Sequence, residues 1–425
     1  MNNNQYSIQG AIIWLLSVSF YLYEFLLRTL VGTFQEPIMH DLNLSTLNFT
    51  LISSTAYLFV YGLMQIPIGA IITRYGFKKS IFFASLICSI ATLGFSCSTN
   101  LAGALFFRAL MGLGSAFGFV GVLVAVYDWM PRNNLALFIG LSQFLGTLGP
   151  MFAGGPFNEL AHSSIMTWQQ FFFILSLIGL LLSLLMSLFI RNKSNAEDSF
   201  IILEKTTQFK TELMAIIKQK QFWDISIYCA LIYFSLEYLS ENECKNLLAA
   251  KGFDSSFSSY MITLSWFGFA LGSPLFGYFS DKIKLRKPIL VFSAVTSFFS
   301  LFFIVYIPLA EWGAIIAFFA YGFGIGSASV GIAIMTEQFK TNQVSSALGI
   351  NNAVTMLSAS VMAPIISYIL SINATHIGPT LADYQRVFSL LALLPIVSLL
   401  IVLFKIKETF GRSSKEPIIL NYEQS

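Results

Sequence analysis

Runs of about twenty apolar residues recur along almost the whole chain, and no other feature limits its fold so strongly. A helix of about 20 apolar residues is long enough to cross the hydrocarbon layer of a bilayer. Runs of this kind lie near residues 11–34, 49–73, 80–98, 101–127, 135–157, 168–190, 222–240, 256–280, 288–308, 311–335, 343–371 and 384–404. The sequence therefore predicts an all-α membrane protein with twelve transmembrane helices.

Charged residues make up only 11% of the chain, against roughly 25% in soluble globular proteins. The net charge is +3 and forms no basic stripe, so nucleic acid is not expected as a partner. The sequence lacks a phosphate-binding Gly-x-x-x-x-Gly-Lys-Ser/Thr loop, and its His and Cys residues show no metal-ligand spacing. We therefore expect no enzyme activity, no cofactor and no metal, and we expect the lipid bilayer and a small-molecule substrate as partners.

The distribution of Lys and Arg predicts the orientation in the membrane, because cytoplasmic loops retain positive charge. If the amino terminus is inside, 19 of the 24 Lys and Arg residues lie on inner loops and the tail, and three lie on outer loops. Both termini are thus predicted to be cytoplasmic. The short loops are typical of a bacterial inner-membrane protein.

A long polar stretch divides the chain into two halves that resemble each other. The predicted domains are an amino-terminal bundle at 1–190, a linker at 191–221, a carboxy-terminal bundle at 222–404 and a cytoplasmic tail at 405–425. Parallel repeats related by an axis along the membrane normal are one way in which transporters are built. We expect two pseudo-symmetric bundles of six helices.

The loop after the second predicted helix carries a recognisable motif. It keeps Gly69, Arg74, Gly76 and Lys79 of the pattern Gly-x-x-x-Asp-Arg-x-Gly-Arg-Arg/Lys, but Thr73 stands where the pattern has Asp. This pattern resembles the signature of the major facilitator superfamily, and the likeness extends over essentially the full length of the chain.

A degenerate second copy follows the eighth predicted helix, with Gly277 and Asp281. In the family, such charges pair with an acid that closes helix 4 or helix 10, and Asp128 and Glu337 match those positions. The resemblance implies a cytoplasmic gate that holds the outward-open state. Alternatively, these charges only set the topology.

The segments FYLYEFLLRTLVGTF and AYLFVYGLMQIPIGAIITRYG are similar to a subgroup of the family, the phagosomal nutrient transporters of intracellular bacteria. This likeness is confined mainly to the first two helices. It implies uptake of amino acids or nucleosides.

Ionisable residues inside predicted spans are candidates for function, since each costs roughly 2.5–3.5 kcal/mol to insert. Glu24 and Arg28 lie one turn apart in the first helix, and Arg108 in the fourth helix is expected at a similar depth. Glu24 would exchange a proton for an Arg partner, while Arg28 or Arg108 binds a substrate carboxylate. The alternative is a permanent pair of Glu24 with Arg28 or Arg108 that fixes helix packing.

The seventh helix offers Glu237 as a second proton-coupling group, whereas Glu241 and Glu243 are expected in solvent. Polar and aromatic residues within the spans are candidates to line a substrate cavity, or else to bond helices together. They are Tyr57, Tyr61, Gln65, Gln143, Tyr233, Trp266, Tyr321, Asn351 and Asn352.

These features favour a secondary active transporter that works as a monomer by alternating access. The expected activity is proton-coupled uptake of a small polar organic solute, an amino acid or a related carboxylate. A drug or metabolite exporter with the same fold is one alternative, and a membrane sensor that does not transport is another.

Overall fold

The computed structural model describes residues 7–131, 135–162, 166–192, 213–339, 341–373 and 379–409, and every regular element in these ranges is helical. Most of the predicted linker, and the tail beyond residue 409, lie outside the described residues. Eleven helical segments are long and apolar enough to cross a membrane. A twelfth and more polar segment lies at Lys220–Glu243, so the predicted all-α fold with twelve spans is confirmed.

These segments are single or broken helices that follow the predicted order. The first half comprises α1 (Ile8–Thr33), α2 (Gln35–Asp41), α3 (Thr46–Thr50), η1 (Leu51–Thr55), α4 (Ala56–Met64), α5 (Ile68–Tyr75), α6 (Phe77–Ser96), α7 (Leu101–Ser115), α8 (Phe117–Trp129), α9 (Leu135–His162) and α10 (Trp168–Phe189). The second half comprises α12 (Lys220–Tyr238), η4 (Leu239–Glu243), α13 (Cys244–Ala250), α14 (Ser255–Ile283), α15 (Lys287–Tyr306), α16 (Glu311–Ile325), α17 (Ala328–Gln338), α18 (Thr341–Asn373) and α19 (Leu381–Phe404).

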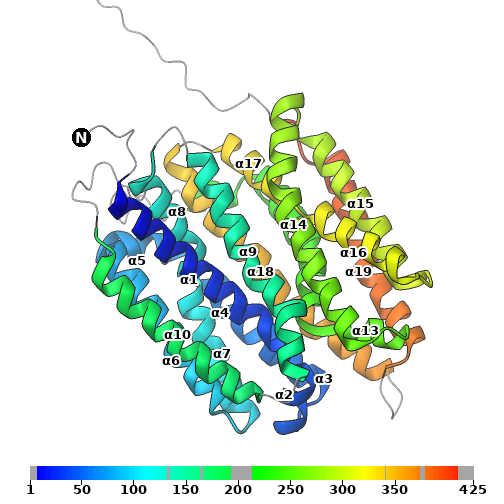
Figure 1. Ribbon diagram of the computed structural model, residues 1–425. Coiled ribbons are helices and arrows are strands. Elements are labelled where there is room, and N and C mark those ends of the chain that lie inside the picture. Colours follow the sequence, from blue (N-terminus) through cyan, green and yellow to red (C-terminus); the bar gives the residue numbers. More distant parts are fainter. Residues whose placement is uncertain are drawn as a thin grey trace, which may run out of the picture.

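The two halves lie side by side, the first drawn from blue to green and the second from light green to red (Figure 1). They pack against each other along α9 with α14 and along α4 with α18. We call the end that bears the loops at 74–79 and 282–287 the basic end, and the end that bears α2 and α13 the opposite end. The first turn of α1 lies at the basic end (Figure 1).

Three spans that the hydropathy predicts as continuous helices are interrupted. The span at 49–73 contains the π-helical turn η1 and a break before Pro67, whose ring and missing N–H remove a helical hydrogen bond. The span at 101–127 is broken at Ala116, and the span at 311–335 is broken near Gly326. A second π-helical turn, η4, follows α12 at the opposite end. Such turns inside helices often mark functional sites.

Candidate functional site

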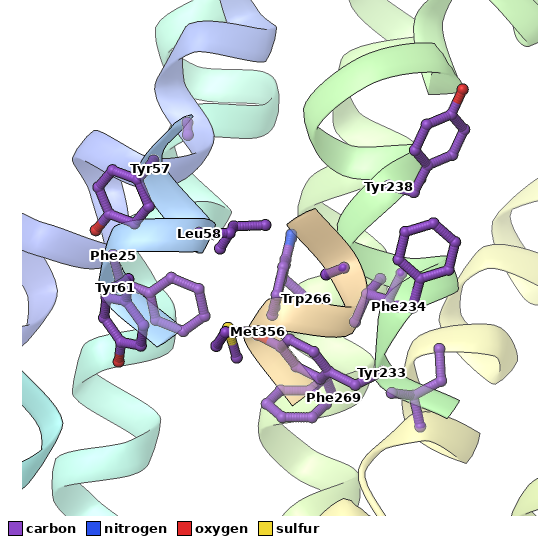
Figure 2. Packing of buried hydrophobic residues seen from close by; sticks show 14 of the residues in the cluster. Phe25, Tyr57, Leu58, Tyr61, Tyr233, Phe234, Tyr238, Trp266, Phe269 and Met356 are labelled. Atoms are coloured by element: carbon purple, nitrogen blue, oxygen red, sulfur yellow. The ribbon is translucent and has the colours of Figure 1, made fainter. Parts of the chain in front are cut away.

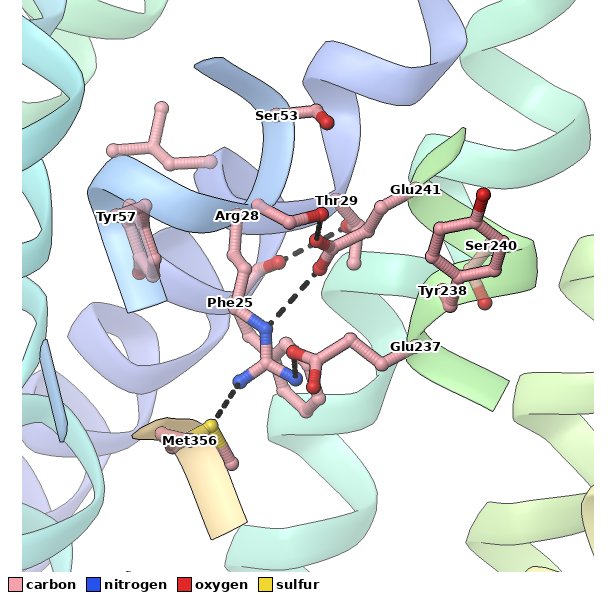
Figure 3. Close-up of polar contacts among 12 residues, drawn as sticks. Phe25, Arg28, Thr29, Ser53, Tyr57, Glu237, Tyr238, Ser240, Glu241 and Met356 are labelled. Atoms are coloured by element: carbon pink, nitrogen blue, oxygen red, sulfur yellow. Dashed lines mark hydrogen bonds and ion pairs between the residues drawn. The ribbon is translucent and has the colours of Figure 1, made fainter. Parts of the chain in front are cut away.

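Arg28 connects the two halves of the molecule (Figure 3). Its Nη2 lies 2.6 Å from Glu237 Oε1 and its Nε lies 3.3 Å from Glu241 Oε1. All three side chains are at most 4% exposed. Arg28 thus pairs with two acids of the other half and not with Glu24, the neighbour that helical spacing predicted.

Other groups hold the Arg28 guanidinium at this position. Its Nη2 donates a hydrogen bond of 2.7 Å to the Tyr233 hydroxyl, and its Nη1 lies 3.9 Å from Met356 Sδ. The guanidinium carbon lies 4.6 Å from the centre of the Phe25 ring, a cation–π contact. The cation therefore has partners on α1, α12 and α18.

Glu24 is buried one turn away, on the first half's side of the interface. The Tyr57 hydroxyl donates to Glu24 Oε2 over 3.0 Å and to the Glu24 main-chain oxygen over 3.2 Å. A Cβ atom on Gly118 would lie 2.7 Å from Glu24 Cγ, so the glycine leaves room for this carboxyl group. Glu24 therefore has a hydrogen-bond donor beside it, and Arg28 lies one turn along the same helix.

Arg108 has a different environment. Its guanidinium donates to the main-chain oxygens of Leu27, Arg28, Ile52 and Ser53 over 2.7–3.3 Å, and it is fully buried. Two of these acceptors belong to the π-helical turn η1. In this conformation Arg108 fastens α1 to η1, and binding of a substrate by Arg108 would require these hydrogen bonds to break.

The two π-helical turns meet across the interface, at the opposite end. The Ser53 hydroxyl donates to Asn242 Oδ1 over 2.6 Å, and Asn242 Nδ2 donates to Ser54 Oγ over 2.9 Å. The Ser54 hydroxyl also donates to Glu241 Oε2 over 3.1 Å. We call these four residues the π-turn contact. It joins the two halves at the opposite end, and it includes Glu241, which also pairs with Arg28.

Further hydrogen bonds join the two halves near the opposite end. Lys245 Nζ donates to the Thr33 main-chain oxygen over 2.8 Å, and the Thr50 and Ser367 hydroxyls lie 2.7 Å apart. Burial lowers the pKa of Lys245 from its ordinary 10.5 to about 8. The π-turn contact and these further hydrogen bonds all lie between the middle of the molecule and the opposite end.

The expectation that Glu241 and Glu243 lie in solvent is wrong, since both are at most 1% exposed. The predicted seventh helix ended at residue 240, but η4 carries the helical backbone through Glu243 and turns Glu241 into the interface. A run of three acids at the end of an apolar helix was the available signal for this site.

Aromatic side chains of both halves lie in one buried cluster (Figure 2). Two of them, Phe25 and Tyr233, lie against the Arg28 guanidinium. The Tyr57 and Tyr61 rings stack with centroids 6.0 Å apart. Trp266 meets Phe25 and Tyr233 edge to face, with centroids 5.2 and 6.2 Å apart. The structure therefore brings Tyr57, Tyr61, Tyr233 and Trp266 together with Arg28.

The remaining predicted cavity residues lie elsewhere or are held by other groups. Gln65 donates to the Ala116 main-chain oxygen over 3.1 Å, and Gln143 accepts from the Tyr21 hydroxyl over 3.2 Å. Tyr321 and Asn351 are buried in the second half. The half-buried Asn352 is hydrogen-bonded to Tyr61 of the site. Their part in substrate binding stays a prediction.

The basic end carries an ion-pair cluster in the second half. Arg286 Nη1 lies 2.6 Å from Asp281 Oδ1, and Arg286 Nη2 lies 2.6 Å from Glu337 Oε1. Burial alone would lower the pKa of Arg286, but its hydrogen bonds to Glu337 and Asp281 raise that pKa above the ordinary value. Sequence analysis missed Arg286, although it lies within the degenerate motif that contains Gly277.

The matching region of the first half is organised differently. Gly76 has a φ of 84°, a left-handed conformation that favours glycine. Lys79 is exposed, and the exposed Arg74 lies over the Tyr75 ring. The Gly69 main-chain oxygen accepts from the hydroxyl of Thr73 over 3.0 Å, so the substituted position bonds within its own helix. Asp128 is half-buried at the end of α8.

At the basic end, a residue that follows the last helix of each half accepts hydrogen bonds from the start of another helix of the same half. These capped helices are α6 in the first half and α15 in the second. Asn192 Oδ1 accepts from the main-chain N–H of Lys78 over 2.9 Å. The Glu408 carboxylate accepts from the main-chain N–H groups of Arg286 and Lys287 over 2.9–3.0 Å. The two halves thus use the same device with different residues.

Comparison with known families agrees with this architecture. A family model described as Major Facilitator Superfamily matches residues 13–241 and 245–418. The chain is similar to the hexuronate transporter of Bacillus subtilis (strain 168), with 25% identity over 48% of this chain and 47% of that protein. It is also similar to the sialic acid transporter NanX of Escherichia coli (strain K12), with 26% identity over 61% of this chain and 62% of that protein. The chain thus spans about half to three fifths of the length of these relatives.

Two solved structures share the fold. A bacterial homolog of the human lysosomal transporter Spinster, inward-facing and unoccupied, has a TM-score of 0.72 and 17% identity, covering 97% of this chain and 100% of that chain. The nucleoside transporter NupG has a TM-score of 0.72 and 14% identity, covering 93% of this chain and 99% of that chain.

Proposed function

Because the chain belongs to the Major Facilitator Superfamily and is a multi-pass membrane transporter, we propose that it takes up a small organic carboxylate together with protons. It works as a monomer in a bacterial inner membrane, with both termini in the cytoplasm. The Lys and Arg distribution supports this orientation. The basic end is then cytoplasmic, and the structure represents a state closed toward the outside.

The observation that carries the proposal is the unequal charge around Arg28. One guanidinium faces two carboxyl groups, Glu237 and Glu241, in a site that is almost fully buried. Both carboxylates contact this one cation, because the nearby Arg108 guanidinium donates to main-chain oxygens and forms no ion pair among the described residues. Burying two ionised carboxylates against a single contacting cation is costly. A proton on one of them removes this cost. The site therefore favours a bound proton when the opposite end is closed.

A carboxylate substrate would compete with these acids for Arg28. The planar guanidinium binds a carboxylate through two parallel hydrogen bonds. Displacing Glu237 or Glu241 leaves that acid buried without its cation, and breaking a buried pair in this way costs about 3–5 kcal/mol. Protonation of the displaced acid offsets the cost. Substrate and proton thus stabilise each other's binding, which is the requirement for coupled transport.

Glu24 supplies a second proton-binding position one turn toward the basic end. Its carboxyl group accepts from the Tyr57 hydroxyl and has no ion pair among the described residues. It lies on the side of Arg28 from which a cytoplasmic opening would admit water. We propose that Glu24 receives the proton after Arg28 releases the substrate.

Two lines of evidence support a carboxylate as the substrate. Of the two arginines buried within the spans, Arg28 has side-chain acceptors as partners, whereas the guanidinium of Arg108 donates to main-chain oxygens. In addition, the names of two relatives mention hexuronate and sialic acid, and both of these are organic acids. Amino acids share the carboxylate and stay within the proposal.

The test begins with a thermal-shift screen of purified protein against glucuronate, N-acetylneuraminate, amino acids and nucleosides. The ligand that stabilises most is then offered to proteoliposomes with an acidic exterior. We expect Glu24→Gln to abolish proton-driven accumulation and to retain exchange of internal for external substrate. Glu36→Gln, at an exposed position of the opposite end, is the matched control and should behave as wild type.

Two results would contradict the proposal. Normal accumulation by the Glu24→Gln protein would remove Glu24 from proton coupling. Stabilisation by nucleosides alone, with no response to any carboxylate, would rule out Arg28 as a carboxylate site.

A further inference from the structure

We propose that Glu243 is an additional proton-binding carboxyl group of the transport cycle, an inference that rests on the proposed function. Glu243 is the last residue of η4 and is 1% exposed. It lies outside the Arg28 site, because its contacts are with α13 and α19 of its own half. Its chemistry has no part in the mechanism given above.

The two oxygens of Glu243 have different surroundings. Oε2 accepts from Asn246 Nδ2 over 3.0 Å and from the Tyr384 hydroxyl over 3.2 Å. Oε1 is buried and has no hydrogen-bond partner among the described residues. Both donors face Oε2, so Oε2 is the acceptor and Oε1 is the oxygen that can carry a proton, in a carboxylic acid whose O–H has no acceptor among the described residues.

No cation compensates Glu243 in the part of the chain that the structure describes. The titratable groups around it are the Tyr238 and Tyr384 hydroxyls and the thiol of Cys244, which follows it in the chain, and Asp383 lies next to Tyr384. None of these groups is a cation. Lys245, two residues along, donates to the Thr33 main-chain oxygen of the other half. An ionised Glu243 would therefore be a buried charge without a partner, and binding a proton avoids that cost.

The position of Glu243 ties this proton to opening of the opposite end. Glu241 and Asn242 precede it in the same π-helical turn and form half of the π-turn contact. If Glu241 and Asn242 leave Ser53 and Ser54, the turn that carries Glu243 moves with them. Water then reaches the carboxyl group, the Oε1–H bond breaks and the proton passes to that water. Closure reverses the step.

Infrared spectroscopy of the purified protein tests this inference without any substrate. At neutral pH we expect Glu243→Gln to remove one carbonyl band of a protonated carboxyl group, which shifts in heavy water. Glu243→Asp should restore a band of this kind and shows that the site still folds. Glu36→Gln, the exposed control, should leave this band unchanged.

A second measurement uses a variant that is expected to open the opposite end. A Cβ atom on Gly32 would lie 2.6 Å from the Glu241 main-chain oxygen, so Gly32→Ala pushes η4 away from α1. We expect the Glu243 band to be weaker in this variant than in wild type. The inference is overturned if Glu243→Gln removes a carboxylate band instead, or if the acid band keeps its strength in a Gly32→Ala protein that is demonstrably open. Neither result depends on Glu24, so the proposed function and this inference fail separately.

Discussion

Gly32 offers a direct way to shift the molecule between its two end states. Its Cα packs against η4, where an added Cβ would lie 2.6 Å from the Glu241 main-chain oxygen and 2.9 Å from the Glu241 Cα. Carbon and oxygen atoms in ordinary contact are about 3.5 Å apart. The two backbones must therefore separate by almost an ångström for Gly32→Ala to be accommodated. The obstacle is main chain on both sides, so no side-chain rotation relieves it.

The expected effect follows from the cost of overpacking, about 1–3 kcal/mol. The higher helix propensity of Ala applies to both end states and cancels between them. At about 1.4 kcal/mol per factor of ten, the ratio of closed to open molecules should fall roughly 5- to 150-fold. Gly140→Ala is the matched control, because a Cβ there meets no atom within 4 Å.

Spin labels at the opposite end report this shift as a distance. His40 lies in α2 of the first half and Ala250 ends α13 of the second, and both are exposed. Labelled cysteines at these two positions, with the exposed Cys97 replaced by Ser, leave three buried cysteines unreactive. Gly32→Ala should add a longer distance that wild type and Gly140→Ala lack. An unchanged distance distribution in the Gly32→Ala protein would refute the assignment of the π-turn contact as the closed gate.

Other perturbations give independent checks. Arg28→Lys keeps the charge but loses the paired donors. Because a hydrogen bond to a charged group contributes about 1.5–3 kcal/mol, carboxylate affinity measured by calorimetry should fall about tenfold or more. Unchanged affinity would argue against a carboxylate at Arg28. Arg108→Leu removes the donors to the main-chain oxygens and should lower the free energy of unfolding by about 3 kcal/mol or more, measured as a lower melting temperature. A wild-type melting temperature would contradict the structural role. Lys245 binds its proton less tightly in the closed state, so raising the pH through 8 should favour closure in the spin-label distances, and Lys245→Met should remove that dependence. Glu408→Gln weakens the cap on α15 and should cost about 1 kcal/mol of stability, whereas Glu36→Gln should cost nothing measurable.

The fold was largely predictable because each span carries its own signal. Length and hydropathy place a helix without knowledge of its neighbours, and the observed bounds agree with the predicted spans to within a few residues. The interruptions were harder to place. Pro67 marks one of them in the sequence, but nothing local indicates that residues 51–55 and 239–243 wind as π-helical turns.

The candidate site was only partly predictable, because its contacts join distant parts of the chain. Spacing along one helix predicted Glu24 as the partner of Arg28, whereas the partner observed at Glu241 is 213 residues away. The position of Arg28, Arg108 and Glu237 inside predicted spans correctly indicated that they are buried. It does not indicate which acceptors a buried cation will contact. Arg108 shows the difficulty, since its acceptors are main-chain oxygens that no side-chain pattern reveals.

The caps at Asn192 and Glu408 bear on how the molecule can be divided. Each half fastens its own final segment to its own basic end, through Lys78 in one case and Lys287 in the other. The covalent connection between the halves starts only after Asn192 has been anchored. Rotation of one half against the other is therefore not transmitted as tension into α10. By the same reasoning, two separately encoded polypeptides cut between residues 193 and 212 retain both anchors, and they should reassemble into a working carrier when produced in one cell.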